Sequence, residues 1–280
     1  MTKQWNVISL GAGVQSSTMA LMASRGELLG IEVDFAIFAD TQDESKKVYD
    51  WLDWLEKQLS FPVYRVTKGK LSEHVLRVRT SEKNNTSRTG NQIPLFGIDT
   101  DGKVVYNGSR KCTVDFKVQA INKEIRARCG VKRGQKKPTA TSLIGISYDE
   151  MQRMKDNPNL WVVNRWPLVE MKMRRGDCVS WMLKNGYPEP PRSSCVYCPF
   201  HSNKEWRRLQ TEEPEEFAKA VEIDEKLRSI NASMENNSLR MIPYLHRSCK
   251  PLNKIDFRSD VERGQGLFDF GDECDGMCGV

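Results

Sequence analysis

The stretch that decides the fold is Ser9-Leu10-Gly11-Ala12-Gly13-Val14-Gln15-Ser16-Ser17, which overlaps the end of the apolar run 5–10. Residues 16–22 then have the composition of a helix, so the order is strand, glycine-rich turn, helix. Such a turn presents backbone N–H groups and the positive end of a helix to an anion, and glycine lets a phosphate approach the backbone. We therefore predict a phosphate site that contains Ser9, Gly11, Gly13, Gln15, Ser16 and Ser17.

Two common phosphate motifs are excluded for this turn. No Gly-Lys-Ser/Thr follows it, so it is not a Walker loop. The dinucleotide fingerprint Gly-x-Gly-x-x-Gly fails because Ser16 stands where the third glycine is required. Taken alone, the turn also fits a tight strand–helix connection that binds nothing.

The chain after the turn alternates between strand and helix patterns. We predict strands at 31–39, 62–66 and 138–146, an amphipathic helix at 44–59 and a basic helix at 114–128. Alternation of this kind is typical of a parallel sheet with covering helices. The predicted fold class is α/β, with a parallel twisted sheet, helices on both faces and a cysteine-bearing C-terminal extension that is helical and irregular.

The proline-rich stretch 188–191 separates the predicted α/β core from the rest of the chain. We predict one domain at 1–190 and a second at 191–280. The second carries two predicted helices, at 203–209 and 215–230, and ends in an irregular tail.

Residues 80–94 are polar and rich in turn formers. A loop of this length in a compact domain is often a substrate lid, and disorder is the alternative interpretation.

The overall composition indicates a globular protein, with 39% hydrophobic and 29% charged residues. No apolar run approaches the ~18 residues that span a bilayer, and the N-terminus lacks a signal-peptide pattern. We expect a cytoplasmic protein with no membrane partner, in which the eight cysteines form no disulfide framework. The net charge of +6, with basic residues concentrated in 103–137, 172–175 and 204–208, suits a phosphorylated substrate, nucleic acid or a solvated basic face.

The second predicted strand ends in Asp40-Thr41, which places a carboxylate and a hydroxyl at the strand's carboxyl end. Open α/β sheets bind ligands at this edge. We predict that Asp40 and Thr41 contact the ligand, with a helix cap as the alternative role for Asp40.

These residues carry a resemblance. Ser9–Ser17 resembles the modified PP-loop of the adenine-nucleotide α-hydrolase superfamily, and Asp40-Thr41 with Glu44 is similar to its Asp-Thr-x-x-x-Glu segment, one residue shorter here. Within that superfamily the chain most resembles the phosphoadenosine-phosphosulfate (PAPS) reductase family.

Three further segments are similar to motifs of that family, so the resemblance covers most of residues 5–200. Cys112 to Ile121 resembles the Cys-Cys-x-x-x-Lys-Val segment of cluster-bearing adenylyl-sulfate reductases, with Thr113 replacing the second cysteine. Gly145 to Arg153 resembles a Gly-x-Arg-x-Asp-Glu-x-x-x-Arg segment, with Ser147 replacing the arginine. Residues 166–188 resemble the region that leads to the paired cysteines. The resemblance implies an adenine-nucleotide site, for PAPS or for ATP with Mg²⁺, that also contains Asp40, Thr41, Gly145, Asp149, Glu150 and Arg153.

Cys195 and Cys198 form a Cys-x-x-Cys turn, whose spacing lets both thiolates reach one metal centre. Spacing alone leaves zinc, iron–sulfur and a redox disulfide open. The resemblance implies a [4Fe–4S] cluster with Cys112 as third ligand; zinc and no metal are the alternatives. Either Cys249 completes the set or one iron stays open to a sulfur ligand.

The tail contains Glu273-Cys274 and Cys278. Glu273-Cys274 resembles the mobile C-terminal segment of PAPS reductases, which implies that Cys274 is a catalytic nucleophile, although the family's histidine is replaced by Met277. Cys278 would resolve an intermediate as a disulfide with Cys274, or both would be metal ligands. An inert, frayed tail is the alternative.

Three functions follow as expectations. The first is sulfur transfer or reduction on an adenylyl sulfate, with Asp40, Cys274 and Cys278 as catalytic residues and a thioredoxin-like dithiol as reductant. The second is ATP-dependent thiolation or other modification of a nucleic-acid base, and the third is a non-catalytic binding protein. The departures from the family pattern favour a divergent phage or CRISPR-associated mobile-element member, and the further partners expected are nucleic acid at the basic surface and a second copy in a homodimer.

Overall fold

The computed structural model describes residues 3–90 and 92–258, which form two compact units. The first contains residues 3–69 and 114–193, and the second contains residues 70–113 and 194–258. The segment 70–113 therefore belongs with the C-terminal part of the chain, whereas the sequence prediction assigned it to the domain at 1–190. The reason is strand pairing between β6 and β10, which are far apart in the sequence and share no local pattern.

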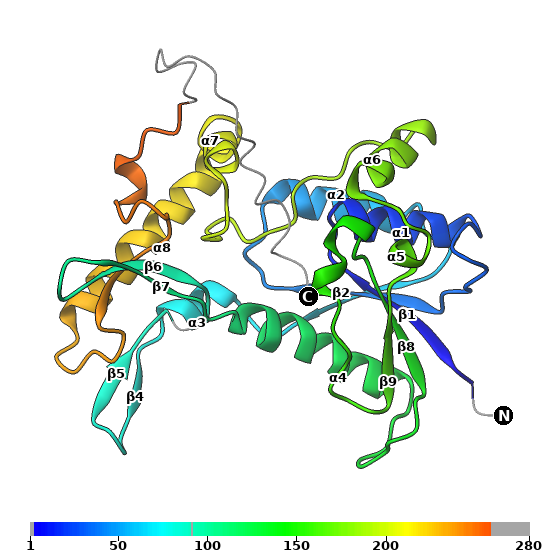
Figure 1. Ribbon diagram of the computed structural model, residues 1–280, viewed down its shortest axis with the longest axis horizontal. Helices are drawn as coiled ribbons and strands as arrows, with labels where there is room; N and C mark the ends of the chain where they lie inside the picture. Colours follow the sequence, from blue (N-terminus) through cyan, green and yellow to red (C-terminus); the bar gives the residue numbers. More distant parts are fainter. Residues whose placement is uncertain (1–2, 91, 259–280) are drawn as a thin grey trace. The chain divides into compact units, whose positions relative to one another are not determined.

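The first unit is built on a five-stranded sheet in which every neighbouring pair is parallel (Figure 1). The strand order is β3-β2-β1-β8-β9. This confirms the predicted α/β class. The strands are β1 (Trp5–Leu10), β2 (Phe35–Asp40), β3 (Val63–Thr67), β8 (Ala140–Ile144) and β9 (Val162–Arg165).

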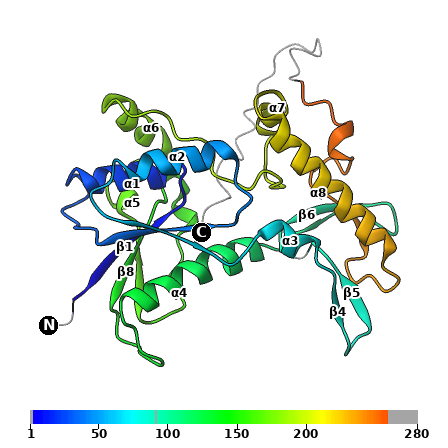
Figure 2. The same cartoon turned by 180° about the vertical axis from the view of Figure 1, so that it is seen from behind.

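Helices cover both faces of this sheet, as predicted (Figures 1 and 2). One face packs against residues of α1 (Val14–Ser24), α2 (Lys46–Glu56), α5 (Pro167–Glu170) and α6 (Arg175–Lys184). The other packs against α4 (Gln119–Arg128). The alternation along β2 shows why both faces are apolar: Phe35, Ile37 and Ala39 face α4, and Ala36 and Phe38 face the opposite layer.

Several predicted boundaries move in the structure. β2 begins at Phe35 rather than residue 31, because Ile31 N donates to Leu28 O in a turn (2.8 Å). The basic helix predicted at 114–128 is divided into a π-helical segment, η1 (Cys112–Val118), and α4. The short helix η2 (Tyr148–Arg153), β9, α5 and α6 had no counterpart in the prediction.

The second unit contains a three-stranded antiparallel sheet of order β10-β6-β7 and two longer helices. The predicted helices at 203–209 and 215–230 are confirmed as α7 and α8. Its elements are α3 (Leu71–Leu76), β4 (Arg79–Ser81), β5 (Thr86–Arg88), β6 (Leu95–Asp99), β7 (Val104–Asn107), α7 (Asn203–Glu212), α8 (Pro214–Ser233), β10 (Met241–Tyr244) and η3 (Leu252–Lys254).

The polar stretch predicted as a lid or a disordered loop at 80–94 is mostly a β-hairpin. β4 pairs antiparallel with β5, and Asn85 in the turn has a left-handed φ of 48°. Ser87 N donates to Asn236 O (2.8 Å), and Ser238 N donates to Ser87 O (2.8 Å). The prediction was wrong because these backbone partners come from a distant part of the sequence.

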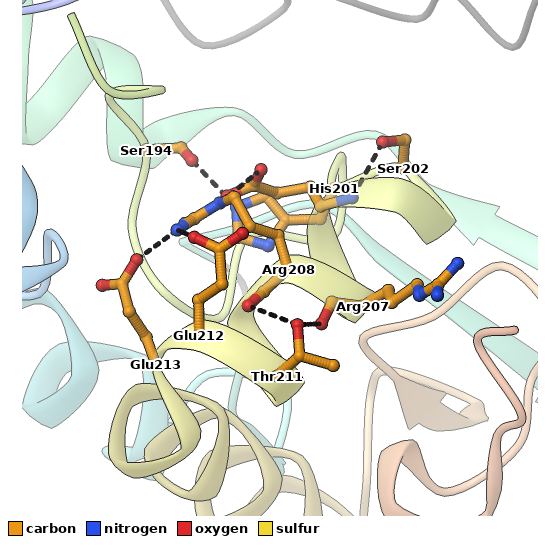
Figure 3. Close-up of polar contacts among 9 residues, drawn as sticks. Ser194, His201, Ser202, Arg207, Arg208, Thr211, Glu212 and Glu213 are labelled. Carbon is orange, nitrogen blue, oxygen red and sulfur yellow. Dashed lines mark hydrogen bonds and ion pairs between the residues drawn. The ribbon is translucent and has the colours of Figure 1, made fainter.

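Charged side chains join α7 to the start of α8 (Figure 3). Ser202 caps α7 by accepting from Glu205 N (3.2 Å). Arg208 pairs with Glu205 at 2.8 Å and also with Glu213, which lies just before α8. The hydrogen bond to Glu205 is the largest cause of a raised pKa for Arg208. No helix in the described ranges has both the length and the apolar character needed to cross a bilayer.

Buried Asp224 of α8 organises the segment that follows β10. Its Oδ1 accepts from Leu245 N and its Oδ2 from Leu252 N, each at 3.0 Å. Arg228, one turn along the same helix, pairs with Oδ2. Because the carboxylate is almost fully buried, these bonds replace the water it loses on folding.

His246 is held as a neutral imidazole in this segment. Nδ1 accepts from Ser248 N (3.1 Å), so the proton is on Nε2, which donates to Asn203 Oδ1 (2.9 Å). Burial lowers the pKa of His246 to about 4. A second proton would be placed against the Ser248 N–H group.

We predict that this histidine makes the protein less stable in mild acid. The folded pKa lies below the ordinary value of ~6.5, so the unfolded chain takes up the proton first as the pH falls. The stabilising contribution is complete above about pH 6.5 and is lost towards pH 4, by about 3 kcal/mol. Urea unfolding at pH 7 and pH 4.5 measures this loss, and His246→Gln is expected to reduce it. His74→Gln, at a partly exposed position of α3, is the control; an equal change in both variants would contradict the assignment.

Candidate functional site

Strand order places a crevice at the carboxyl ends of β1 and β8. These strands are neighbours, but the chain leaves β1 towards β2 and leaves β8 towards β9, on the opposite side. Ligands of open α/β sheets bind where the connections diverge in this way. The turn at Gly11–Gly13 and the residue Gly145 lie at this point.

The turn between β1 and α1 is braced by one hydroxyl group. Ser16 Oγ accepts from Gly11 N and donates to Gly13 O, both at 3.2 Å. Ala12 has a left-handed φ of 56°, which costs roughly 1–2 kcal/mol for a residue other than glycine. The first turn of α1 contains no acidic residue, and its N–H groups have no partner within the helix. The turn therefore has the geometry and charge of an anion site.

Gly145 is required by the closeness of two backbones. A Cβ at this position would lie 2.7 Å from Ser16 Cα and 2.8 Å from Ser16 N. Any side chain would push the end of β8 away from the start of α1. The glycine found by the sequence prediction is thus a packing residue for the phosphate turn.

Two predicted hydroxyl donors lie differently from expectation. Ser17 is fully buried, and its Oγ accepts from Trp51 Nε1 (3.0 Å), so it is a core contact between α1 and α2. Ser9 lies within β1, in register with Ile37 and Ile144. Ser16 is the serine that shapes the turn.

Asp40 ends β2 and is held by two hydrogen bonds. Its Oδ1 accepts from Gln42 N (2.7 Å) and from Tyr49 OH (2.8 Å). Burial and then the bond to Asp40 raise the pKa of Tyr49. Asp40 is not the N-cap of α2, which is Ser45, and the neighbouring Thr41 is fully buried.

A buried ion pair lies beside the turn. The Glu44 carboxylate accepts from Lys117 Nζ (3.2 Å) and Ser193 Oγ (3.5 Å), and its side chain is 0% exposed. Ser193 Cβ lies 3.8 Å from where a Cβ on Gly13 would be, so Ser193 links the pair to the turn. Glu44 and Lys117 were outside the predicted binding set, although both belong to segments that carry the family resemblance.

A second polar cluster connects α1 with η2 and α6. Gln15 Nε2 donates to Glu150 Oε2, and Gln15 Oε1 accepts from Arg175 Nη1, both at 3.1 Å. Arg153 Nη1 donates to Glu150 Oε2 (2.7 Å), and Arg175 N donates to Asp149 Oδ1 (3.1 Å). Burial is the main cause of a raised pKa for Glu150. Four predicted residues therefore meet here, joined by Arg175, which the prediction noted only as part of a basic stretch.

The cysteines predicted as metal ligands all belong to the second unit. Cys195 and Cys198 share a tight turn in which Cys198 N donates to Cys195 O (3.0 Å). Cys112 N donates to Gln92 O (2.6 Å). Buried Cys249 donates from Sγ to Gly97 O (3.4 Å).

These side-chain positions do not form the predicted four-cysteine centre. Across residues 3–90 and 92–258, no three Cys, His, Asp or Glu side chains are arranged to hold a metal ion. We therefore derive no reaction step through a metal. The predicted catalytic residues Cys274 and Cys278 lie outside the described residues.

Cys129 and Cys178 are structural, as predicted. Both are buried, Cys178 completely. Burial raises the pKa of the Cys129 thiol to about 11 and that of Cys178 to about 12. Such thiols are protonated and unreactive at neutral pH.

No protein-family model matches the sequence, and no curated protein matches it. Among solved structures, the chain is similar to a phosphoadenylyl-sulfate (PAPS) reductase from Candida auris in a phosphate complex. The similarity covers 68% of this chain and 75% of that protein, with a TM-score of 0.37 and 12% sequence identity. It is a distant, fold-level likeness to an α/β enzyme.

We predict that Gly145→Ala destabilises the protein by about 1–3 kcal/mol, because the added methyl group overlaps the backbone of Ser16. Urea unfolding measures the loss. Gly176→Ala in α6 is the matched control, since nothing lies within 4 Å of its added Cβ. Equal losses in the two variants would contradict the close-packing role of Gly145.

Proposed function

We propose that the chain is a PAPS reductase-like enzyme that binds an adenine nucleotide, PAPS or ATP, at the Gly11–Gly13 turn and carries out sulfur transfer or reduction. The observation that carries the nucleotide half of the proposal is the braced turn at the divergence of β1 and β8, with Gly145 packed against it. A phosphate accepts from the N–H groups of the turn and of the first turn of α1.

The ion pair and the polar cluster supply further groups for such a ligand. Lys117 is linked to the turn through Glu44 and Ser193, and in the proposal it neutralises charge on the phosphates. Gln15, Glu150 and Arg175 offer donors and acceptors on the other side of α1. Asp40, with one oxygen engaged by Gln42 and Tyr49, keeps its proposed role at the reacting end.

The sulfur half of the proposal rests on the sequence resemblance. Cys274 is assigned the attack on sulfur, Cys278 or a thioredoxin-like dithiol the release of the product. ATP-dependent modification of a base is distinguished by its product, since it forms pyrophosphate only when nucleic acid is present.

Nucleotide binding is tested by thermal unfolding with ATP, AMP and 3′,5′-bisphosphoadenosine. A ligand at 100 times its Kd stabilises the folded state by about 2.7 kcal/mol. We expect ATP or the bisphosphate to raise the Tm by several degrees and AMP to act more weakly, because it carries one phosphate. Failure of all three would contradict the site.

Ser16→Ala is expected to weaken the nucleotide-induced shift about tenfold in apparent affinity, because the turn loses its brace, a loss of about 1.4 kcal/mol. Ser24→Ala, at the other end of the same helix, is the control and should bind as the wild type. A shift unchanged by Ser16→Ala would place the nucleotide elsewhere.

The cysteine prediction is tested separately by metal analysis of anaerobically purified protein. A [4Fe–4S] cluster predicts iron, sulfide and visible absorbance, all lost in Cys195→Ser, whereas the alternative predicts zinc. The control is Cys129→Ser, since Cys129 is buried in the first unit. Colourless, metal-free wild type would contradict both metal interpretations without affecting the nucleotide site.

A further inference from the structure

One part of the molecule concentrates positive charge away from the candidate site. Residues 125–137 contain six Lys or Arg and no Asp or Glu. Those six charges equal the formal excess of the whole chain, +6, so the rest of the sequence is balanced. All six residues are exposed. We call them the basic segment: Arg126, Arg128, Lys132, Arg133, Lys136 and Lys137.

The basic segment is largely without internal counter-charges. Arg128 pairs with Glu124 (2.6 Å). For Lys132, Arg133, Lys136 and Lys137, the described part of the chain provides no ion pair. Solvated lysines on ordinary protein surfaces are commonly interspersed with acidic residues, as on α8, where Lys219 and Lys226 pair with glutamates.

The four cations of the loop are presented by an organised turn. Gln135 N donates to Lys132 O, and Gln135 Oε1 accepts from Lys132 N, both at 3.2 Å. Gln135 Nε2 also donates to Lys137 O (3.1 Å) and bonds Thr139 Oγ1. Gly134 adopts φ +78°, which a side chain would strain. The charges are therefore held close together rather than spread along a flexible chain.

Topology separates the basic segment from the nucleotide site. The segment follows α4 and precedes β8, so it lies at the amino edge of the parallel sheet. The turn at Gly11–Gly13 and Gly145 lie at the carboxyl edge. The five residues of β8 span about 17 Å between the two edges. A lysine or arginine side chain cannot cover that distance, so the segment does not serve the phosphates of a nucleotide in the proposed site.

We propose that the basic segment binds the sugar–phosphate backbone of a nucleic acid, independently of sequence. Several fixed cations without counter-charges match a polymer that carries a phosphate at every residue, and their binding releases condensed counterions. This proposal does not depend on the proposed nucleotide chemistry.

Contacts near the segment favour the backbone over the bases. Arg128 already lies over the ring of Tyr64, 3.1 Å from its centroid, and Lys3 lies over Trp5 at 4.0 Å. These aromatic faces are covered by cations and do not offer stacking platforms. Residues 132–137 contain no large apolar side chain that would insert into a lipid surface. A nucleic acid is therefore favoured over a membrane.

The test is fluorescence anisotropy with a labelled DNA duplex and a single strand of about 20 nucleotides, over a range of salt concentrations. The test variant is Lys132→Ala/Arg133→Ala/Lys136→Ala/Lys137→Ala. We expect it to lose at least about tenfold in affinity and to flatten the plot of log K against log salt by up to about 3.6, at ~0.9 per phosphate contact on a duplex.

The matched control removes the same charge from α7, α8 and η3, as Lys204→Ala/Lys219→Ala/Lys226→Ala/Lys254→Ala. All four positions are exposed. The control should keep the salt slope of the wild type, and both variants should keep the wild-type Tm. Equal losses in the two variants, or no wild-type binding at low salt, would overturn the proposal. Co-sedimentation with phosphatidylserine vesicles in the absence of DNA binding would also overturn it, and would assign the surface to a membrane.

Discussion

The candidate site depends on the contact between Gly145 and Ser16. β8 pairs with β1 in parallel register, with Ser9 opposite Ile144, so the two chains leave the sheet side by side. The space left by the missing side chain of Gly145 lets the first turn of α1 approach the end of β8. Ser16 then braces the turn at Gly11–Gly13 and directs its N–H groups into the crevice.

A single helical stretch serves the two edges of the sheet in different ways. Lys117, in η1, reaches the buried carboxylate of Glu44 at the carboxyl edge. Arg126 and Arg128 lie at the far end of α4, next to the amino edge. Because the helix runs antiparallel to the strands, one basic stretch of sequence is separated into a buried ion pair and an exposed surface. The charge pattern alone did not distinguish these two environments.

Local sequence patterns predicted much of the first unit. The strand–turn–helix at Ser9–Ser17, the α/β class and the buried Cys129 and Cys178 are confirmed, because neighbouring residues carry their signal in periodicity and apolarity. The hairpin within 80–94 was missed because Ser87 finds its backbone partners near residue 237. Polar strands whose partners are distant leave little local signal, and the same reason places 70–113 in the second unit.

The sequence by itself determined that a glycine-rich turn would connect a buried strand to a helix, since chain order, glycine and apolar runs are local properties. Tertiary structure alone decided what the polar residues around that turn contact. It directs Ser17 to Trp51, joins Gln15 to Glu150 and Arg175, and pairs Glu44 with Lys117. These partners lie far apart in the chain, and only the parallel register and helix packing bring them within hydrogen-bonding distance.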